Sequence, residues 1–155
     1  MKVPRVYIDT SVVGGCFDTE FEHWSNLLVD NFRRGYFKPV VSDIVANEIN
    51  DAPAHVGRKY NEIVFYGAEL LEANDESARL MRHYRSHKIL SGKFEDDMMH
   101  IALATVAQVD ILVSWNFKHI VHYDKIRQFN AINIEQGYKP LVIYSPREVA
   151  HEKEV

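Results

Sequence analysis

Short runs of apolar, β-prone residues alternate along the chain with longer segments in which apolar residues recur every three or four positions. The runs predict buried strands at residues 6–8, 37–41, 111–113 and 141–144. The longer segments predict helices at residues 18–34, 42–52, 95–107 and 122–130. Strands that alternate with helices in this way favour an α/β fold with a mainly parallel sheet covered by helices on both faces.

Glycine residues and breaks in the helical pattern mark two further stretches of the chain. The Gly14–Gly15 pair follows the first strand and allows tight backbone turning there, because glycine tolerates backbone conformations that other residues avoid. Residues 54–90 are mostly helical in pattern, with breaks near Gly67 and at Asn74–Asp75. Within them, residues 69–73 fit either a continued helix or a short strand, and the pattern does not decide between the two.

The length and composition of the chain set its organisation. With 155 residues, of which 46% are hydrophobic, the chain has enough material for one compact domain, which we place at residues 1–150 with a polar tail at residues 151–155 that frays. No stretch approaches the roughly 20 apolar residues of a membrane span, so we expect no membrane association. Cys16 is the only cysteine, which excludes an intramolecular disulfide and fits a packing residue in a cytoplasmic protein.

The net charge of the chain limits how it could contact nucleic acid. A formal net charge of −4 provides no overall electrostatic attraction to phosphates, so any such contact must be local. One basic stretch could serve as a phosphate-binding stripe, although a plain solvated surface is the preferred interpretation. Its members are Arg79, Arg82, Arg85 and Lys88.

Oxygen-bearing side chains are expected to meet at one edge of the sheet. Asp9 and Asn116 follow two predicted strands, and Glu48 and Asp97 lie on helical segments close to strand ends. Ligands of open parallel sheets gather at the carboxyl ends of the strands. Clustered carboxylates repel one another unless a cation compensates, and Mg²⁺ or Mn²⁺ prefers such oxygen ligands. A cation held there could activate water against a phosphodiester.

Four ordered segments of the sequence resemble the successive motifs of PIN-domain proteins, including VapC-like toxins of toxin-antitoxin systems. They are Tyr7-Ile8-Asp9-Thr10-Ser11, Ser42-Asp43-Ile44-Val45-Ala46-Asn47-Glu48-Ile49, Asp97-Met98-Met99-His100-Ile101-Ala102 and Val113-Ser114-Trp115-Asn116-Phe117-Lys118-His119. The resemblance covers nearly the whole chain. It implies a three-layer α/β/α sandwich, metal-dependent cleavage of single-stranded RNA, a homodimer, and inhibition by a small antitoxin protein.

The resemblance also assigns roles to the acidic residues. Asp9, Glu48 and Asp97 match the metal-binding acids of the family, whereas Asn116 stands at a catalytic position that is often aspartate. Asparagine offers a neutral carbonyl oxygen, so it could orient water or bind a cation weakly. One metal ion is therefore favoured over two. The alternative is a catalytically weak or inactive PIN-like module that binds RNA or another protein.

Some neighbouring residues allow two interpretations. Asp96 and Asp97 point about 100° apart on a helix, and the motif spacing selects Asp97 as the ligand. Thr10 and Ser114 could position water or an acidic side chain, or could instead cap turns beside their strands.

Histidine and aromatic residues close to the motifs are also ambiguous. For His100 and His119 we favour a structural hydrogen-bonding role over zinc binding or general-base catalysis. For Trp115 and Phe117 we favour core packing over the stacking of an unpaired base.

Overall fold

The computed structural model describes residues 2–152 and consists of a five-stranded parallel sheet covered by helices. The strands are β1 (Arg5–Ile8), β2 (Lys38–Ser42), β3 (Glu69–Leu71), β4 (Ile111–Val113) and β5 (Ile143–Tyr144). The helices are α1 (Thr10–Gly15), α2 (Glu22–Arg33), α3 (Asp43–Asn50), α4 (Ala54–Phe65), α5 (Asp75–Ser86), α6 (Glu95–Val106), α7 (Tyr123–Glu135) and α8 (Pro146–Val149), with a 3-10 turn at Gly92–Phe94.

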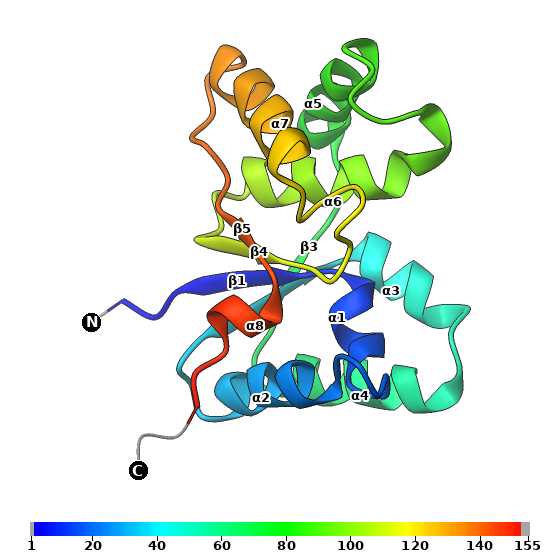
Figure 1. The fold of residues 1–155 in the computed structure, drawn as a ribbon, viewed down its shortest axis with the longest axis vertical. Coiled ribbons are helices and arrows are strands. Elements are labelled where there is room, and N and C mark those ends of the chain that lie inside the picture. Colours follow the sequence, from blue (N-terminus) through cyan, green and yellow to red (C-terminus); the bar gives the residue numbers. More distant parts are fainter. Residues whose placement is uncertain (1, 153–155) are drawn as a thin grey trace.

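The sheet separates two layers of helices. Helices α5, α6 and α7 lie above it in Figure 1, and α2, α4 and α8 lie below it. The strand order is β3-β2-β1-β4-β5, so β1 is the central strand and has a parallel neighbour on each side. The predicted three-layer α/β/α sandwich with a parallel sheet is confirmed.

The central strand carries the core on both of its faces. Val6, Tyr7 and Ile8 are fully buried, as expected for a strand that helices cover on both sides. Val40 and Val41 on β2, and Leu112 and Val113 on β4, continue this buried layer. Because β1 and β4 are parallel neighbours, Asp9 and Ser114, which follow them, emerge at the same edge of the sheet.

The helix caps explain several of the boundaries that the sequence predicted. Ser42 begins α3 as expected, because its hydroxyl accepts a hydrogen bond from the Val45 N–H. Asn74 begins α5 with a reciprocal capping box to Ser77. The break at Gly67 follows the end of α4, and this residue adopts a positive φ of 91°.

Four details differ from the sequence-based expectations or resolve them. Gly14 and Gly15 do not form the tight turn that this pair would allow, since both residues belong to α1. Residues 69–73 contain the short edge strand β3, which settles the open alternative in favour of a strand. The final strand is reduced to Ile143–Tyr144, and α7 runs five residues beyond the predicted end at residue 130, to Glu135.

The end of the described chain is anchored at one point. The His151 N–H donates to Oδ1 of Asn31 (2.7 Å), and the His151 ring stacks on Phe37. Residues 153–155 of the predicted tail lie outside the described residues. Between residues 2 and 152, no helix combines the length and the apolar character that crossing a membrane requires.

Candidate functional site

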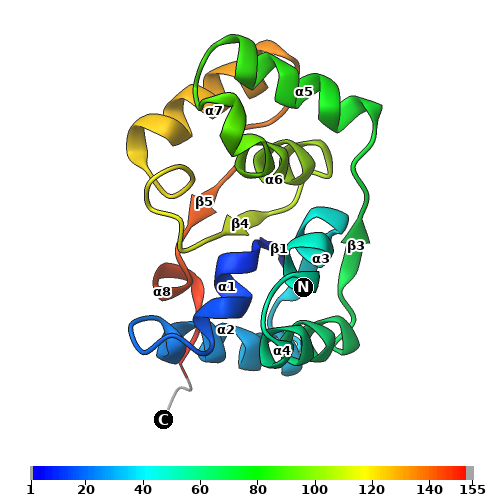
Figure 2. The ribbon, with the colours of Figure 1, turned by 90° about the vertical axis from the view of Figure 1, so that its right-hand side faces the viewer.

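The predicted site residues lie at the carboxyl edge of the sheet. Figure 2 views the molecule from this edge, where α1, α3 and α6 surround the end of β1. Asp9 precedes α1 directly, Glu48 lies on α3, and Asp97 lies in the first turn of α6. Asn116 follows β4 by three residues.

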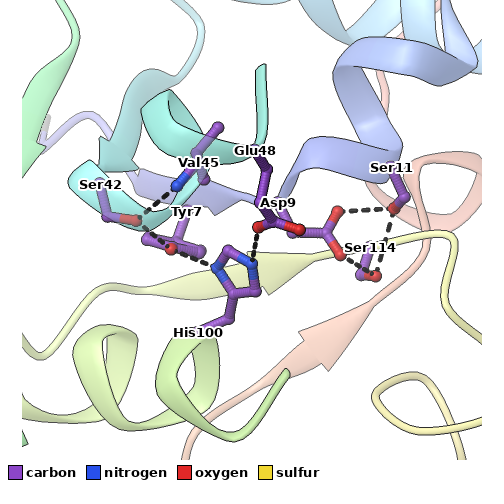
Figure 3. A network of polar contacts seen from close by, with 8 residues as sticks. All are labelled: Tyr7, Asp9, Ser11, Ser42, Val45, Glu48, His100 and Ser114. Atoms are coloured by element: carbon purple, nitrogen blue, oxygen red, sulfur yellow. Dashed lines mark hydrogen bonds and ion pairs between the residues drawn. The ribbon is translucent and has the colours of Figure 1, made fainter. Parts of the chain in front are cut away.

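Two serine hydroxyls hold the carboxylate of Asp9. Ser11 donates to Oδ1 and Ser114 donates to Oδ2, each at 2.6 Å, as Figure 3 shows. The serines are themselves fixed, because their oxygens accept the backbone N–H groups of Trp115 and Asn116, respectively (both 2.9 Å). Asp9 is therefore oriented by residues that come from the ends of two different strands.

The environment of Asp9 opposes its negative charge. Only 5% of the residue is exposed, and burial raises the pKa of its carboxyl group above the ordinary value. The charge of nearby His100 and the hydrogen bonds from Ser11 and Ser114 act in the opposite direction without cancelling this effect. A cation next to Asp9 would supply the missing compensation.

Glu48 is held by a chain of buried polar groups. Its Oε1 lies 2.8 Å from Nε2 of His100, whose Nδ1 lies 2.7 Å from the hydroxyl of Tyr7. The Tyr7 hydroxyl is also hydrogen bonded to the Ser42 hydroxyl at 2.7 Å, and Ser42 caps the helix that carries Glu48. This arrangement fixes the His100 ring from both sides.

His100 and Glu48 favour each other's charged forms. Burial opposes the ionisation of both, but the His100 hydrogen bond and charge prevail and keep the pKa of Glu48 below its ordinary value. The hydrogen bond to Glu48, together with the charges of Asp9, Glu48 and Asp97, raises the pKa of His100 despite its burial. The protonated form of His100 would supply positive charge among the site carboxylates.

A second histidine holds Asp97. His119 Nδ1 lies 2.9 Å from Oδ2 of Asp97, and the His119 backbone N–H donates to Oδ1 of Asn116 at 3.0 Å. The ring of Phe94 packs on the His119 ring with centroids 4.0 Å apart. Asn116 thus uses its carbonyl oxygen to close a turn, while His119 connects it to Asp97.

Two further residues lie at the margin of the site. The Thr10 hydroxyl is close enough to Glu48 to help lower its pKa, but it meets no partner in hydrogen-bonding geometry among residues 2–152. Asp96 is largely exposed, but partial burial of its carboxyl group and the charge of Glu48 raise its pKa. Asp97, in contrast, is half-buried and paired with His119.

The chemistry of these donors fits a hard divalent cation, but the side chains are not oriented so that they form its coordination shell. The carboxylates of Asp9, Glu48 and Asp97 are oxygen donors of the kind that Mg²⁺ and Mn²⁺ prefer. Within the described part of the chain, however, no group of three or more His, Cys, Asp or Glu side chains is positioned to hold a metal ion. Glu48 and Asp97 point at their histidines instead.

The sequence alone did not reveal several members of this network. Ser11 and Tyr7 lie outside the predicted set of site residues, and the sequence does not identify the hydrogen-bond partners of His100 and His119. Closeness in sequence could have identified Ser11 and His100 as site residues, because each lies within three residues of a predicted acid. Tyr7 carries no such signal, since a tyrosine in an apolar strand is normally a core residue.

Comparison with known proteins supports the fold and goes no further. No protein-family model matches the chain, and no curated protein matches it. Among solved structures, it is similar to a chain in the crystal structure of VapBC2 from Rickettsia felis bound to a DNA fragment from its promoter. The TM-score is 0.54 at 13% sequence identity, and the alignment covers 91% of this chain and 98% of that chain.

Proposed function

We propose that this protein is a PIN-like ribonuclease that uses Mg²⁺ or Mn²⁺ to hydrolyse phosphodiester bonds in single-stranded RNA. The observation that carries the proposal is the placement of Asp9, Glu48 and Asp97 around the end of the central strand, joined by one hydrogen-bonded and electrostatic network. The similarity in fold to a chain of VapBC2 is consistent with this function.

The cation would be held by Asp9, Glu48 and Asp97. When bound, it would activate water for attack on phosphorus and offset the charge that develops on the phosphoryl oxygens. Asp9 needs little rearrangement, because Ser11 and Ser114 fix its orientation and each carboxylate oxygen retains a free lone pair. Glu48 and Asp97 would turn away from His100 and His119.

The histidines stabilise the site when no cation is present. Protonated His100 holds a proton at Nε2 against Glu48 and stands among the carboxylates that would otherwise repel one another. Asn116 supplies no charge, so the site is suited to one firmly held cation.

A cellular role can be inferred from the proposed ribonuclease function. We infer a cytoplasmic toxin of a toxin-antitoxin pair, which forms a homodimer and is inhibited by a small antitoxin protein. VapBC2, which resembles this chain in fold, was crystallised with a DNA fragment from its promoter.

The function can be tested by cleavage of labelled single-stranded RNAs of varied sequence in the presence of Mn²⁺. We expect cleavage by the wild-type protein, its loss in EDTA, and a decrease of at least about 100-fold in Asp9→Asn and Asp97→Asn, because either change removes a charged cation ligand. Asp51→Asn, which alters an exposed carboxylate at the end of α3, should cleave like wild type.

Cleavage that resists EDTA, or full activity in both site variants, would overturn the metal-dependent mechanism. If clean wild-type protein cleaves none of the RNAs, the function as a nuclease fails and a PIN-like binding module takes its place.

A further inference from the structure

A hollow of about 400 Å³ next to the candidate site is lined by aromatic rings. Four of its eight lining residues are aromatic, and the others are polar or charged. The lining consists of Phe21, Trp24, Trp115 and Phe117 together with Glu20, Ser145, Arg147 and Glu148. Its volume lies within the range of about 300–1,000 Å³ that is usual for small-ligand sites.

The aromatic wall is rigid on one side and exposed on the other. Trp115 stacks on Phe21 with ring centroids 4.2 Å apart, and its indole N–H donates to the Ser25 hydroxyl at 2.8 Å. Phe117 stands at 64° to Trp115 with centroids 6.1 Å apart, and 49% of it is exposed. The core position expected for Phe117 is therefore wrong, whereas Trp115 is buried as expected.

The hollow is connected to the candidate site through short contacts. The Trp115 backbone N–H donates to the Ser11 hydroxyl, which in turn donates to Asp9. Trp115 also follows Ser114, the second serine that holds Asp9. Trp115 therefore belongs both to the aromatic wall and to the contacts that fix the serines around Asp9.

Of the three charged residues in the lining, Arg147 is a cation, whereas Glu20 and Glu148 carry negative charge. Arg147 is exposed and can face a phosphate or stack on a base, since guanidinium groups do both. The carboxylate of Glu148 is engaged in a capping box with Ser145, whose N–H and hydroxyl both donate to it at 3.0 Å. This engagement reduces its repulsion of an incoming strand.

We propose that the hollow binds one unpaired nucleobase of the RNA strand, stacked on Phe117. The inference rests on the proposed function for the identity of the strand. The lining of the hollow has aromatic rings but no aliphatic side chains. This favours a nucleobase over an apolar side chain of a partner protein, because bases of single-stranded nucleic acid stack on aromatic side chains. Such stacking tolerates every base, so the hollow positions the strand without selecting a sequence.

The chain provides its own probe for this proposal. It has two tryptophans, Trp24 and Trp115, and both line the hollow. We expect a short single-stranded RNA, added in EDTA to prevent cleavage, to change the intrinsic tryptophan fluorescence in a saturable manner. A ribose-phosphate chain of the same length without bases should bind more weakly and leave the fluorescence unchanged.

Variants at exposed phenylalanines make the test specific. Phe117→Ala and Phe117→Leu should each weaken RNA binding by about tenfold, since both remove the stacking ring and the second keeps apolar bulk. Phe65→Ala is the matched control, because Phe65 is 85% exposed at the end of α4 and is not part of the hollow. Thermal melts establish that all three variants are folded.

The outcomes separate this inference from the nuclease proposal. RNA binding that leaves the fluorescence unchanged, or that Phe117→Ala does not weaken, would overturn the nucleobase site. A fluorescence response to an apolar peptide but not to RNA would assign the hollow to a protein partner and also overturn it. Base-dependent quenching without any cleavage would support the nucleobase site while the nuclease function fails.

Discussion

Asp9 shows most clearly how a single residue departs from its ordinary structural role. An aspartate that directly precedes a helix normally caps it by accepting a backbone N–H. Asp9 occupies this position in front of α1, yet its side chain makes no capping hydrogen bond. Its oxygens are instead held by Ser11 and Ser114. A buried carboxylate that serine hydroxyls orient is suited to a ligand role.

Removal of one serine hydroxyl tests how much Asp9 depends on it. We expect Ser114→Ala to lower the free energy of unfolding by about 1–3 kcal/mol, because a buried carboxylate oxygen loses its donor. Ser86→Ala, at an exposed hydroxyl that donates to the His83 carbonyl, should change it by less than about 0.5 kcal/mol. Urea denaturation gives both values, and equal effects would contradict the role of Ser114.

Asn116 allows a complementary test by addition of charge. Asn116→Asp should tighten Mn²⁺ binding measured by calorimetry, because it adds a negative charge next to the site. The acceptor for the His119 N–H is preserved, since a carboxylate oxygen replaces the amide oxygen. Unchanged or weaker Mn²⁺ affinity would count against a place for this residue near the cation.

Among the elements, α1 is where the sequence misled most. Two adjacent glycines suggested a turn, but α1 uses one of them for close packing. A Cβ at Gly15 would lie 2.6 Å from the Ser25 hydroxyl and 2.8 Å from the Trp115 indole nitrogen. Only the folded structure brings these two side chains against α1, so the local sequence could not reveal the reason for the glycine.

The adjacent glycines provide a matched pair of substitutions. Gly15→Ala should destabilise the protein by about 1–3 kcal/mol, because the added methyl group displaces the hydrogen-bonded Ser25 and Trp115 pair. Gly14→Ala meets nothing within 4 Å and should stabilise the protein by about 0.5–1 kcal/mol, since alanine favours a helix. Thermal unfolding measures both, and a stabilising Gly15→Ala would contradict this packing.

The other elements were predictable where their sequence pattern is strong, including β4, a run of three apolar residues predicted at its observed bounds. Helix α6 was expected at residues 95–107 and runs from Glu95 to Val106. Strands β3 and β5 have three and two residues, too few for a period to emerge, and they are held by pairing with β2 and β4. Their boundaries therefore depend on tertiary contacts.

At the scale of the whole molecule, the fold brings four distant segments to one edge of the sheet, where their side chains form two hydrogen-bonded groups. Ser114 links Asn116 to Asp9, His119 links Asn116 to Asp97, and His100 holds Glu48. The sequence predicted which segments meet, because the ends of parallel strands share an edge. The sequence could not predict the hydrogen-bond partner of each histidine, since this depends on side-chain orientations across α3, α6 and the segment after β4.

The central claim is that Asp9, Glu48 and Asp97 form one divalent-cation site, and the anomalous scattering of Mn²⁺ in a crystal of the protein tests it most directly. We expect a single strong Mn²⁺ peak at the end of β1, in contact with these three carboxylates, with Glu48 and Asp97 turned away from His100 and His119. A Mn²⁺-soaked crystal without a peak there, in which both ion pairs with the histidines persist, would contradict the account.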